Sequence, residues 1–199
     1  MFKSLPTVAV AGTGNTLVGS QTKLANVTVS ADAKGDVQLR QLIFSVATTS
    51  VTVTAFHLDG PSGNTASTTA NAFGITGAQT IVFTLDSTSN TSDRVVAANG
   101  SRTYGLYYNS ATGISATAGA SSLSASLQAD TAYPGLVAGV HLSDTSTTSI
   151  AAANIIWSPI STSTSGSVAI VDNDWTNGYG VPLCGQGLAQ NCPSVSIKN

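Results

Sequence analysis

Apolar and hydroxyl-bearing residues alternate along most of this chain, and this period of two restricts its fold more than any other feature. Residues 25–30 and 122–129 show the pattern over their whole length. Further runs of the same kind are centred on Val8, Phe44, Val53, Phe83, Leu106, Trp157 and Ile170. Because successive side chains of a strand point to opposite faces, the pattern predicts strands with one buried and one solvated face. We therefore expect an all-β fold, an antiparallel immunoglobulin-like β-sandwich with about nine to eleven strands.

The runs are separated by turn signals, and one run contains an irregularity. Asn99-Gly100 has the residue types of a tight turn, and residues 59–71 have the composition of a long polar loop. The alternation changes phase between Leu39 and Leu42. That change predicts a β-bulge, or a strand that changes sheets, around Arg40-Gln41.

Charged residues are scarce in this chain, which excludes several classes of function and favours some cellular locations over others. Only 8% of the residues are charged, glutamate is absent, and there are 27 Ser and 27 Thr. A soluble helical bundle needs more charge on its outer face. Seven Lys plus Arg at a net charge of −2 are too few for a nucleic-acid-binding surface. A surface of Ser, Thr, Asn and Gly is typical of secreted fibres and coats, so we expect an extracellular protein of the cell surface.

The chain shows neither a membrane span nor a signal sequence. Its longest apolar runs, such as residues 42–47 and 150–157, have the length of core strands. Residues 1–6 contain no apolar stretch of the signal-peptide kind. A cytoplasmic protein, or one whose leader is absent from this numbering, would both fit, and the composition favours the second.

Cys184 and Cys192 are the only cysteines, and they bracket a Gly-containing loop. In an oxidising compartment this pair predicts a local disulfide. Two free thiols or half of a metal site are the alternatives, but no histidine or further cysteine pair lies nearby in sequence. We expect one elaborated sandwich over residues 1–180, followed by a C-terminal tail, residues 181–199, which the disulfide pins.

Three stretches of the chain carry a resemblance: residues 3–8, residues 24–46, and Trp157-Ser158-Pro159 together with residues 172–182. They resemble the entry strand, the first hairpin and the closing segment of modules in large bacterial cell-surface proteins. Those proteins are repetitive, immunoglobulin-like β-sandwich proteins of uncultured lineages with small genomes. The resemblance implies an extracellular structural or adhesive role and supplies no catalytic residues.

The densest cluster of oxygen ligands is Asp172-Asn173-Asp174. Its two carboxylates and one amide are ligand types of a calcium site, which takes about six to eight oxygens. The alternative is a polar turn in which these side chains bond their own backbone. No other metal and no cofactor is expected.

Two features of the sequence concern carbohydrate. Trp175 and Tyr179 follow the acidic cluster and predict either a sugar-stacking platform or two anchors that pack a tail onto the sandwich. Asn26, Asn90 and Asn99 match the N-glycosylation acceptor pattern, which matters only in a cell that glycosylates its surface.

No arrangement of residues in the sequence points to catalysis. His57 and His141 are the only histidines, and no Gly-x-Ser-x-Gly elbow accompanies them. A glycosidase needs two positioned carboxylates, yet glutamate is absent and most aspartates stand in turn contexts. We therefore do not expect an enzyme.

The edges of a sandwich with so little charge lack the usual protection, because soluble monomers guard their edge strands with Lys, Pro or inward charges. Within residues 1–11, the run containing Leu5, Val8 and Val10 is a candidate donor strand for a neighbouring copy. The alternative is that it pairs within its own subunit. We expect a structural subunit of an extracellular filament, pilus-like fibre or surface layer, with copies of itself as partners. A cell-surface adhesin or glycan-binding module is the alternative.

Overall fold

The computed structural model describes residues 4–67, 75–85, 93–130, 154–165, 168–173, 181, 183–187 and 190–199. Within them the chain forms strands and no helix. The strands are β1 (Pro6–Gly12), β2 (Thr22–Ala31), β3 (Val37–Thr49), β4 (Thr52–Gly60), β5 (Gly63–Ser67), β6 (Ala78–Thr84), β7 (Val95–Val96), β8 (Ser101–Thr112), β9 (Ser122–Leu127), β10 (Ile155–Ser165), β11 (Val168–Asn173) and β12 (Val195–Lys198). These are twelve strands, against the nine to eleven expected, and β7 is only two residues long.

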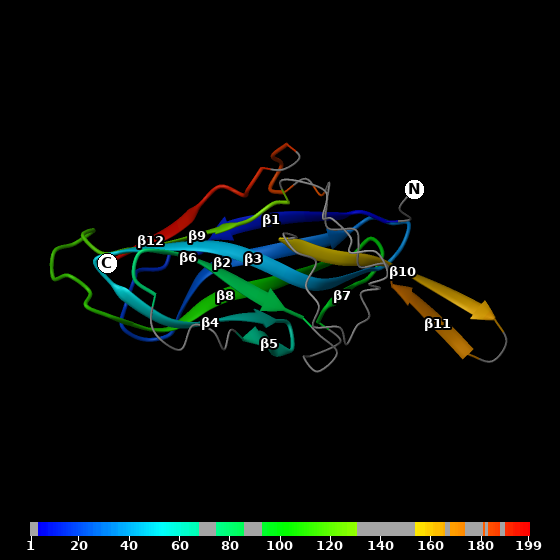
Figure 1. Ribbon diagram of the computed structural model, residues 1–199, viewed down its shortest axis with the longest axis horizontal. Coiled ribbons are helices and arrows are strands. Elements are labelled where there is room, and N and C mark those ends of the chain that lie inside the picture. The colour runs from blue at the N-terminus through cyan, green and yellow to red at the C-terminus, as the bar shows by residue number, and fades with distance from the viewer. Residues whose placement is uncertain are drawn as a thin grey trace, which may run out of the picture.

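The strands form two antiparallel sheets that pack face to face (Figure 1). The five-stranded sheet has the order β1-β2-β8-β4-β5. In the seven-stranded sheet, β10 and β9 follow one another along one edge of β3, and β7 and β6 along its other edge. The expected all-β, antiparallel, two-layer architecture is confirmed, and the immunoglobulin-like type stays a prediction.

The phase change predicted around Arg40-Gln41 is a β-bulge in β3. Ile156 of β10 pairs with Gln41, whereas the next residue, Trp157, pairs with Leu39, so Arg40 is the additional residue. The extra residue lets Leu39 and Leu42 both face the core, where each is fully buried.

The core lies between the sheets and consists of buried apolar residues of β1–β4, β6–β10 and β12, together with residues of the connecting segments. Its largest fully buried side chains are Trp157, Tyr104, Tyr108, Phe44, Phe56 and Phe83. The outer faces carry hydroxyl groups, as shown by the Oγ1 atoms of Thr28 and Thr103, which lie 3.0 Å apart across β2 and β8. This is the distribution that the alternation predicts.

Two segments expected to be irregular contribute strands instead. In the stretch predicted as a polar loop, β4 and β5 form a hairpin in which Gly60 pairs with Gly63. Gly63 has a φ of 103°, a backbone conformation that residues with a side chain rarely adopt. In the predicted tail, β12 pairs with β9, and Leu183, Cys192 and Ile197 are buried in the core. The C-terminal segment is therefore part of the sandwich.

The two flanks of the sandwich connect its sheets in different ways, and one end of the sandwich carries a projecting hairpin. On one flank, β1 and β12 bring the edges of the two sheets together, as at Gly12 and Val195. On the other flank the chain crosses between sheets at Ile75, whose backbone pairs with Val53, and continues into β6. At one end the β10–β11 hairpin projects beyond the body of the sandwich (Figure 1).

Candidate assembly edges

The predicted donor strand is β1, and in this chain it lies at the edge of its own sheet. All seven of its residues pair with Ala25–Ala31 of β2. Val8 is buried, Val10 is partly buried against the core, and Leu5, just before the strand, is 40% exposed. The outer edge of β1 is bonded at Val8, where the N–H of Cys184 donates to the Val8 carbonyl at 2.7 Å. Pro6 has no N–H to offer at this edge.

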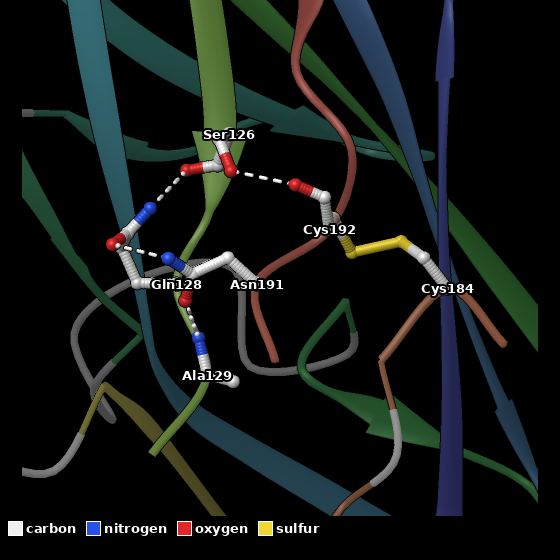
Figure 2. Close-up of a disulfide and its surroundings, with 6 residues drawn as sticks. All are labelled: Ser126, Gln128, Ala129, Cys184, Asn191 and Cys192. Carbon is white, nitrogen blue, oxygen red and sulfur yellow. Dashed lines mark hydrogen bonds between the residues drawn. A yellow bond between two sulfur atoms is a disulfide. The ribbon is translucent and has the colours of Figure 1, made fainter. Parts of the chain in front are cut away.

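The predicted disulfide is present between Cys184 and Cys192, and its loop ties the two sheets together. Cys184 bonds to β1 of the five-stranded sheet. Cys192 bonds to the other sheet: its N–H donates to the Leu127 carbonyl at 3.0 Å, and its carbonyl accepts from Ser126 Oγ at 2.7 Å (Figure 2). Disulfide and hydrogen bonds together close this flank.

Asn191, beside Cys192, strengthens the attachment of the loop. Its Oδ1 accepts the N–H of Ala129 at 2.8 Å, and its Nδ2 donates to Gln128 Oε1 at 3.1 Å (Figure 2). These bonds continue the pairing of the C-terminal segment beyond the end of β9. The bonds of Asn191 and Cys192 thus attach the C-terminal end of the loop to the seven-stranded sheet.

The opposite flank ends in β6, an edge strand that sequence reasoning did not single out. Among the described residues β6 pairs only with β3, over Gln41–Ala47. It carries no charged residue and no proline, and Val82 is 44% exposed. Ile81 and Phe83 are buried, so the strand is held firmly by its inner face. An uncharged, extended edge of this kind is the type that pairs with other chains.

A polar cluster lies on the outer face of the five-stranded sheet, where neighbouring strands bring His57, Tyr107 and Lys23 into one row. The His57 and Tyr107 rings are parallel with centroids 5.1 Å apart, and Lys23 Nζ lies 5.2 Å from the Tyr107 centroid. His57 Nε2 is 2.9 Å from Gln21 Nε2 and 3.5 Å from Asp59 Oδ2. No serine, threonine or cysteine hydrogen-bonds to His57 within the described residues, so this cluster offers no activated nucleophile.

The position of Tyr107 in this cluster has a local cause at Gly105. A Cβ at Gly105 would lie 2.6 Å from Cε2 of Tyr107, so the ring covers the glycine backbone. An aromatic ring over a strand glycine replaces packing that the missing side chain cannot supply. The cluster is therefore explained by sheet packing. Each residue stands in the polar phase of its own strand, and only the strand register reveals that they meet.

A second polar group is buried around Asp93, which is fully inaccessible to solvent. Its carboxylate accepts hydrogen bonds from the N–H and the Oγ of Ser62, at 2.8 and 2.9 Å. Arg102 Nη1 lies 3.6 Å from the same carboxylate. The Tyr104 hydroxyl donates to the Asp93 carbonyl, and burial raises the pKa of this hydroxyl well above its ordinary value. The group joins the β4–β5 turn to β8, which is a structural role.

Asp130 is a buried carboxyl at the end of the described segment that contains β9. It is 5% exposed, its Oδ1 accepts the N–H of Asn154, and its Oδ2 has no hydrogen-bond partner among the described residues. Burial raises the pKa of Asp130, while hydrogen bonds from the backbone of Asn154 and Ile155 oppose the rise. A single carboxyl does not make a metal site, and no group of three or more His, Cys, Asp or Glu side chains converges in the described part of the chain.

The other predicted sites lie partly or wholly outside the described residues. Of the candidate calcium ligands, Asp172 and Asn173 are placed only as backbone of β11, and Asp174 is outside. The candidate sugar platform, Trp175 and Tyr179, is also outside, as are His141 and Asn90. Asn26 is partly exposed on β2, and Asn99 is exposed at a turn with a φ of 57°. No helix that is long and apolar enough to cross a membrane occurs in the described residues.

Comparison with known proteins provides no family for this chain. No family model and no curated protein matches it. A solved structure described by the words "AvmM Catalyzes Macrocyclization in Alchivemycin A Biosynthesis" is similar at 8% identity and a TM-score of 0.31, over 100% of this chain and 89% of that chain. A similarity of this size supports no argument about fold or function.

Proposed function

We propose that this protein is a structural subunit of an extracellular filament, pilus-like fibre or surface layer, and that its copies join through sheet edges. The observation that carries the proposal is the β6 edge. It is uncharged, it is anchored by Ile81 and Phe83, and among the described residues it pairs on one side only. A protein that lives as a dispersed monomer would expose this edge without protection, whereas one that assembles would cover it.

The surface chemistry and the disulfide support the extracellular part of the proposal. Charged residues make up 8% of the chain, and the net charge is −2. Such a surface gives weak colloidal repulsion, which favours association. The Cys184–Cys192 disulfide is of the kind that persists in oxidising compartments.

We further propose edge addition at β6, rather than exchange of β1, as the route of assembly. Donor-strand exchange would require β1 to leave all of its pairing with Ala25–Ala31 and its bond to Cys184. Edge addition at β6 breaks no such contact. The cost of releasing β1 therefore favours β6 as the joining edge.

A filament also needs a second contact, and the β10–β11 hairpin is our candidate. Residues Ile160–Ser165 of β10 pair with β11, beyond the part of β10 that pairs with β3. A two-stranded ribbon alone is only marginally stable in water. Contact with a neighbouring copy would provide the missing support.

Electron microscopy of the purified protein, across salt and calcium concentrations, tests the proposed function. Regular fibres or sheets are the expected result, and surface proteolysis of intact producing cells should release the protein. If only dispersed monomers form under every condition, the proposed function fails.

An adhesin or glycan-binding module is the alternative proposal. The described feature that favours it is the outer-face cluster of Tyr107, His57 and Asp59, which combines rings with hydrogen-bonding groups. Sugar recognition commonly uses aromatic rings together with polar groups, but here Tyr107 already contacts His57 and Lys23. A glycan array compares the wild type with Tyr107→Ala and Trp175→Ala. Binding that either change abolishes supports this alternative, and an array without binding removes it.

A further inference from the structure

The hydrogen bonds at the two ends of β6 determine which of its backbone groups face outward. The N–H of Thr48 donates to Gly77, and the N–H of Leu85 donates to Arg40. Hydrogen-bonded pairs alternate along an antiparallel ladder, so the odd-numbered residues between these two points bond to β3. The N–H and C=O groups of four residues therefore point away from the sheet: Ala78, Thr80, Val82 and Thr84.

These four outward-facing residues form what we call the β6 edge. All four side chains are exposed and uncharged. The strand contains no lysine and no proline, and its pairing with β3 has no bulge. The intervening residues Ile81 and Phe83 are buried. The strand therefore presents its donors and acceptors in a fixed, extended geometry, which lowers the entropic cost of adding another strand.

The same features distinguish the β6 edge from the β1 edge. At β1, Pro6 supplies no donor and the Val8 carbonyl is already bonded to Cys184. At β12, the Lys198 carbonyl accepts the N–H of Leu17, and a charged residue lies in the strand. Within the part of the chain that the structure describes, the β6 edge has neither kind of protection.

We propose that the β6 edge binds the β6 edge of a second copy, antiparallel and about a two-fold axis; this inference deepens the proposed function and depends on it. Outward groups must face outward groups, and a register centred on Ile81 uses all of them. Thr80 then pairs with Val82 of the second copy, and Ala78 with Thr84. Every cross-strand neighbour is uncharged, so the join contains no like-charge repulsion.

The occupant is a second copy because the edge is complementary to itself. A strand rich in charge would be disfavoured beside the uncharged β6 edge, whereas β6 of a second copy is itself uncharged. The two-fold join extends the seven-stranded sheet of one copy into that of the other. The join is small compared with a standard protein interface, so we expect association that depends on concentration.

Sedimentation and amide exchange of the full chain test the join. In the wild type, raising the concentration should protect the amides of Ala78, Thr80, Val82 and Thr84 from exchange. The amides of Gln79, Ile81 and Phe83 bond to β3 and should be protected at every concentration. Protection of alternate residues is a signature that unspecific aggregation does not produce.

Val82→Lys places a charge on the edge and should weaken association at least about tenfold. Val18→Lys is the matched control, because Val18 is 40% exposed, close to the 44% of Val82, and lies outside the strands. Val82→Pro is a second variant, since it removes an outward donor without adding charge or breaking a bond to β3.

A spin label at Thr84→Cys measures the geometry. The native cysteines are joined in the disulfide, so the added thiol is the one that reacts. Six residues along the strand, at about 3.4 Å each, and a strand spacing of about 4.8 Å place the two labelled backbones about 21 Å apart. A measured distance beyond about 35 Å would contradict the two-fold register.

The outcomes separate the two proposals. Loss of association in Val82→Lys and Val82→Pro but not in Val18→Lys, with alternate protection, supports the join. Assembly that persists in both Val82 variants, with the outward amides still exchanging freely, overturns the two-fold join and the proposed β6 route, and leaves only the role as a structural subunit standing. A wild type that stays monomeric at all concentrations overturns both.

Discussion

Removing the disulfide tests the conclusion that the loop of residues 184–192 ties the two sheets together. The double variant Cys184→Ala/Cys192→Ala leaves every hydrogen bond of the loop available. A crosslink between residues separated by 8 positions reduces the entropy of the unfolded chain by an amount equivalent to about 2.5 kcal/mol at 25 °C. Cys192 is 3% exposed, so the lost sulfur contacts add to this figure. We expect the variant to lose about 2.5–3.5 kcal/mol of unfolding free energy.

Urea unfolding, followed by tryptophan fluorescence to which the buried Trp157 contributes, measures this loss. Ser126→Ala is the matched control, because it removes one hydrogen bond to Cys192 and keeps the crosslink. That change should cost about 1 kcal/mol. Amide exchange adds a local measurement, since the Cys184 N–H bonds to Val8 and should exchange faster once the loop is released.

The result that refutes the reasoning is a double variant within about 1 kcal/mol of the wild type. Unchanged exchange at Cys184 would then show that the hydrogen bonds alone hold the loop. A loss well above about 5 kcal/mol would indicate that the crosslink supports more of the sandwich than this flank.

Three further predictions concern single residues. Asp130→Asn should remove a pH dependence of the unfolding free energy. Burial raises the pKa of Asp130 above its ordinary 3.8, so the wild type should lose stability as pH rises from about 3.8 through the raised value, whereas the variant should not. Urea unfolding of both proteins between about pH 3.5 and 7 measures the difference. A wild type whose stability does not fall relative to the variant over this range contradicts the assignment. Tyr104→Phe should cost about 1–2 kcal/mol, because the Asp93 carbonyl loses its donor, whereas Tyr107→Phe on the outer face should cost almost nothing. Equal effects of the two changes in thermal unfolding would exclude a special role for the buried hydroxyl. Deleting Arg40 should leave the chain folded, because the deletion removes the bulge and sets Leu39 and Leu42 two positions apart, the spacing at which a regular strand keeps both on one face. Deleting Ser45, in the regular part of β3, should prevent folding, because it turns the residues on one side of the deletion to the wrong face. An Arg40 deletion variant that is unfolded by circular dichroism would show that the bulge itself is required.

Much of the fold could be predicted from the sequence because strand alternation is a local signal. Leu39 and Leu42 even locate the bulge, since two core residues three positions apart do not fit one regular strand. The sequence does not predict strands β5 and β12, because they are short and contain Gly, Ser or Lys, so neither shows a clear alternation of apolar and polar residues. Their pairing with β4 and β9 is what makes them strands.

The assembly edges could not be predicted in the same way, because an edge is a property of topology. The run with Val8 and Val10 looks like a free donor strand in sequence, yet in the fold one side pairs with β2 along its whole length and the other side is bonded to Cys184 at Val8. The Ala78–Thr84 run looks like any core strand, yet only one of its sides is paired among the described residues. Sequence alternation reports which face of a strand is buried and says nothing about its neighbours.

The contrast between the two flanks limits the kinds of assembly this protein can form. On the flank of β1, Pro6 offers no N–H, the Val8 carbonyl is bonded to Cys184, and β12 lies beside Gly12. On the flank of β6, a two-fold join would use the whole open edge and would therefore close on itself as a dimer. A filament or layer built on that join must then grow through a different surface, and the projecting β10–β11 hairpin is the one we propose (Figure 1). Deleting the hairpin while keeping β6 should therefore stop growth at the β6 dimer, whereas Val82→Lys should remove the β6 join and leave only association through the hairpin.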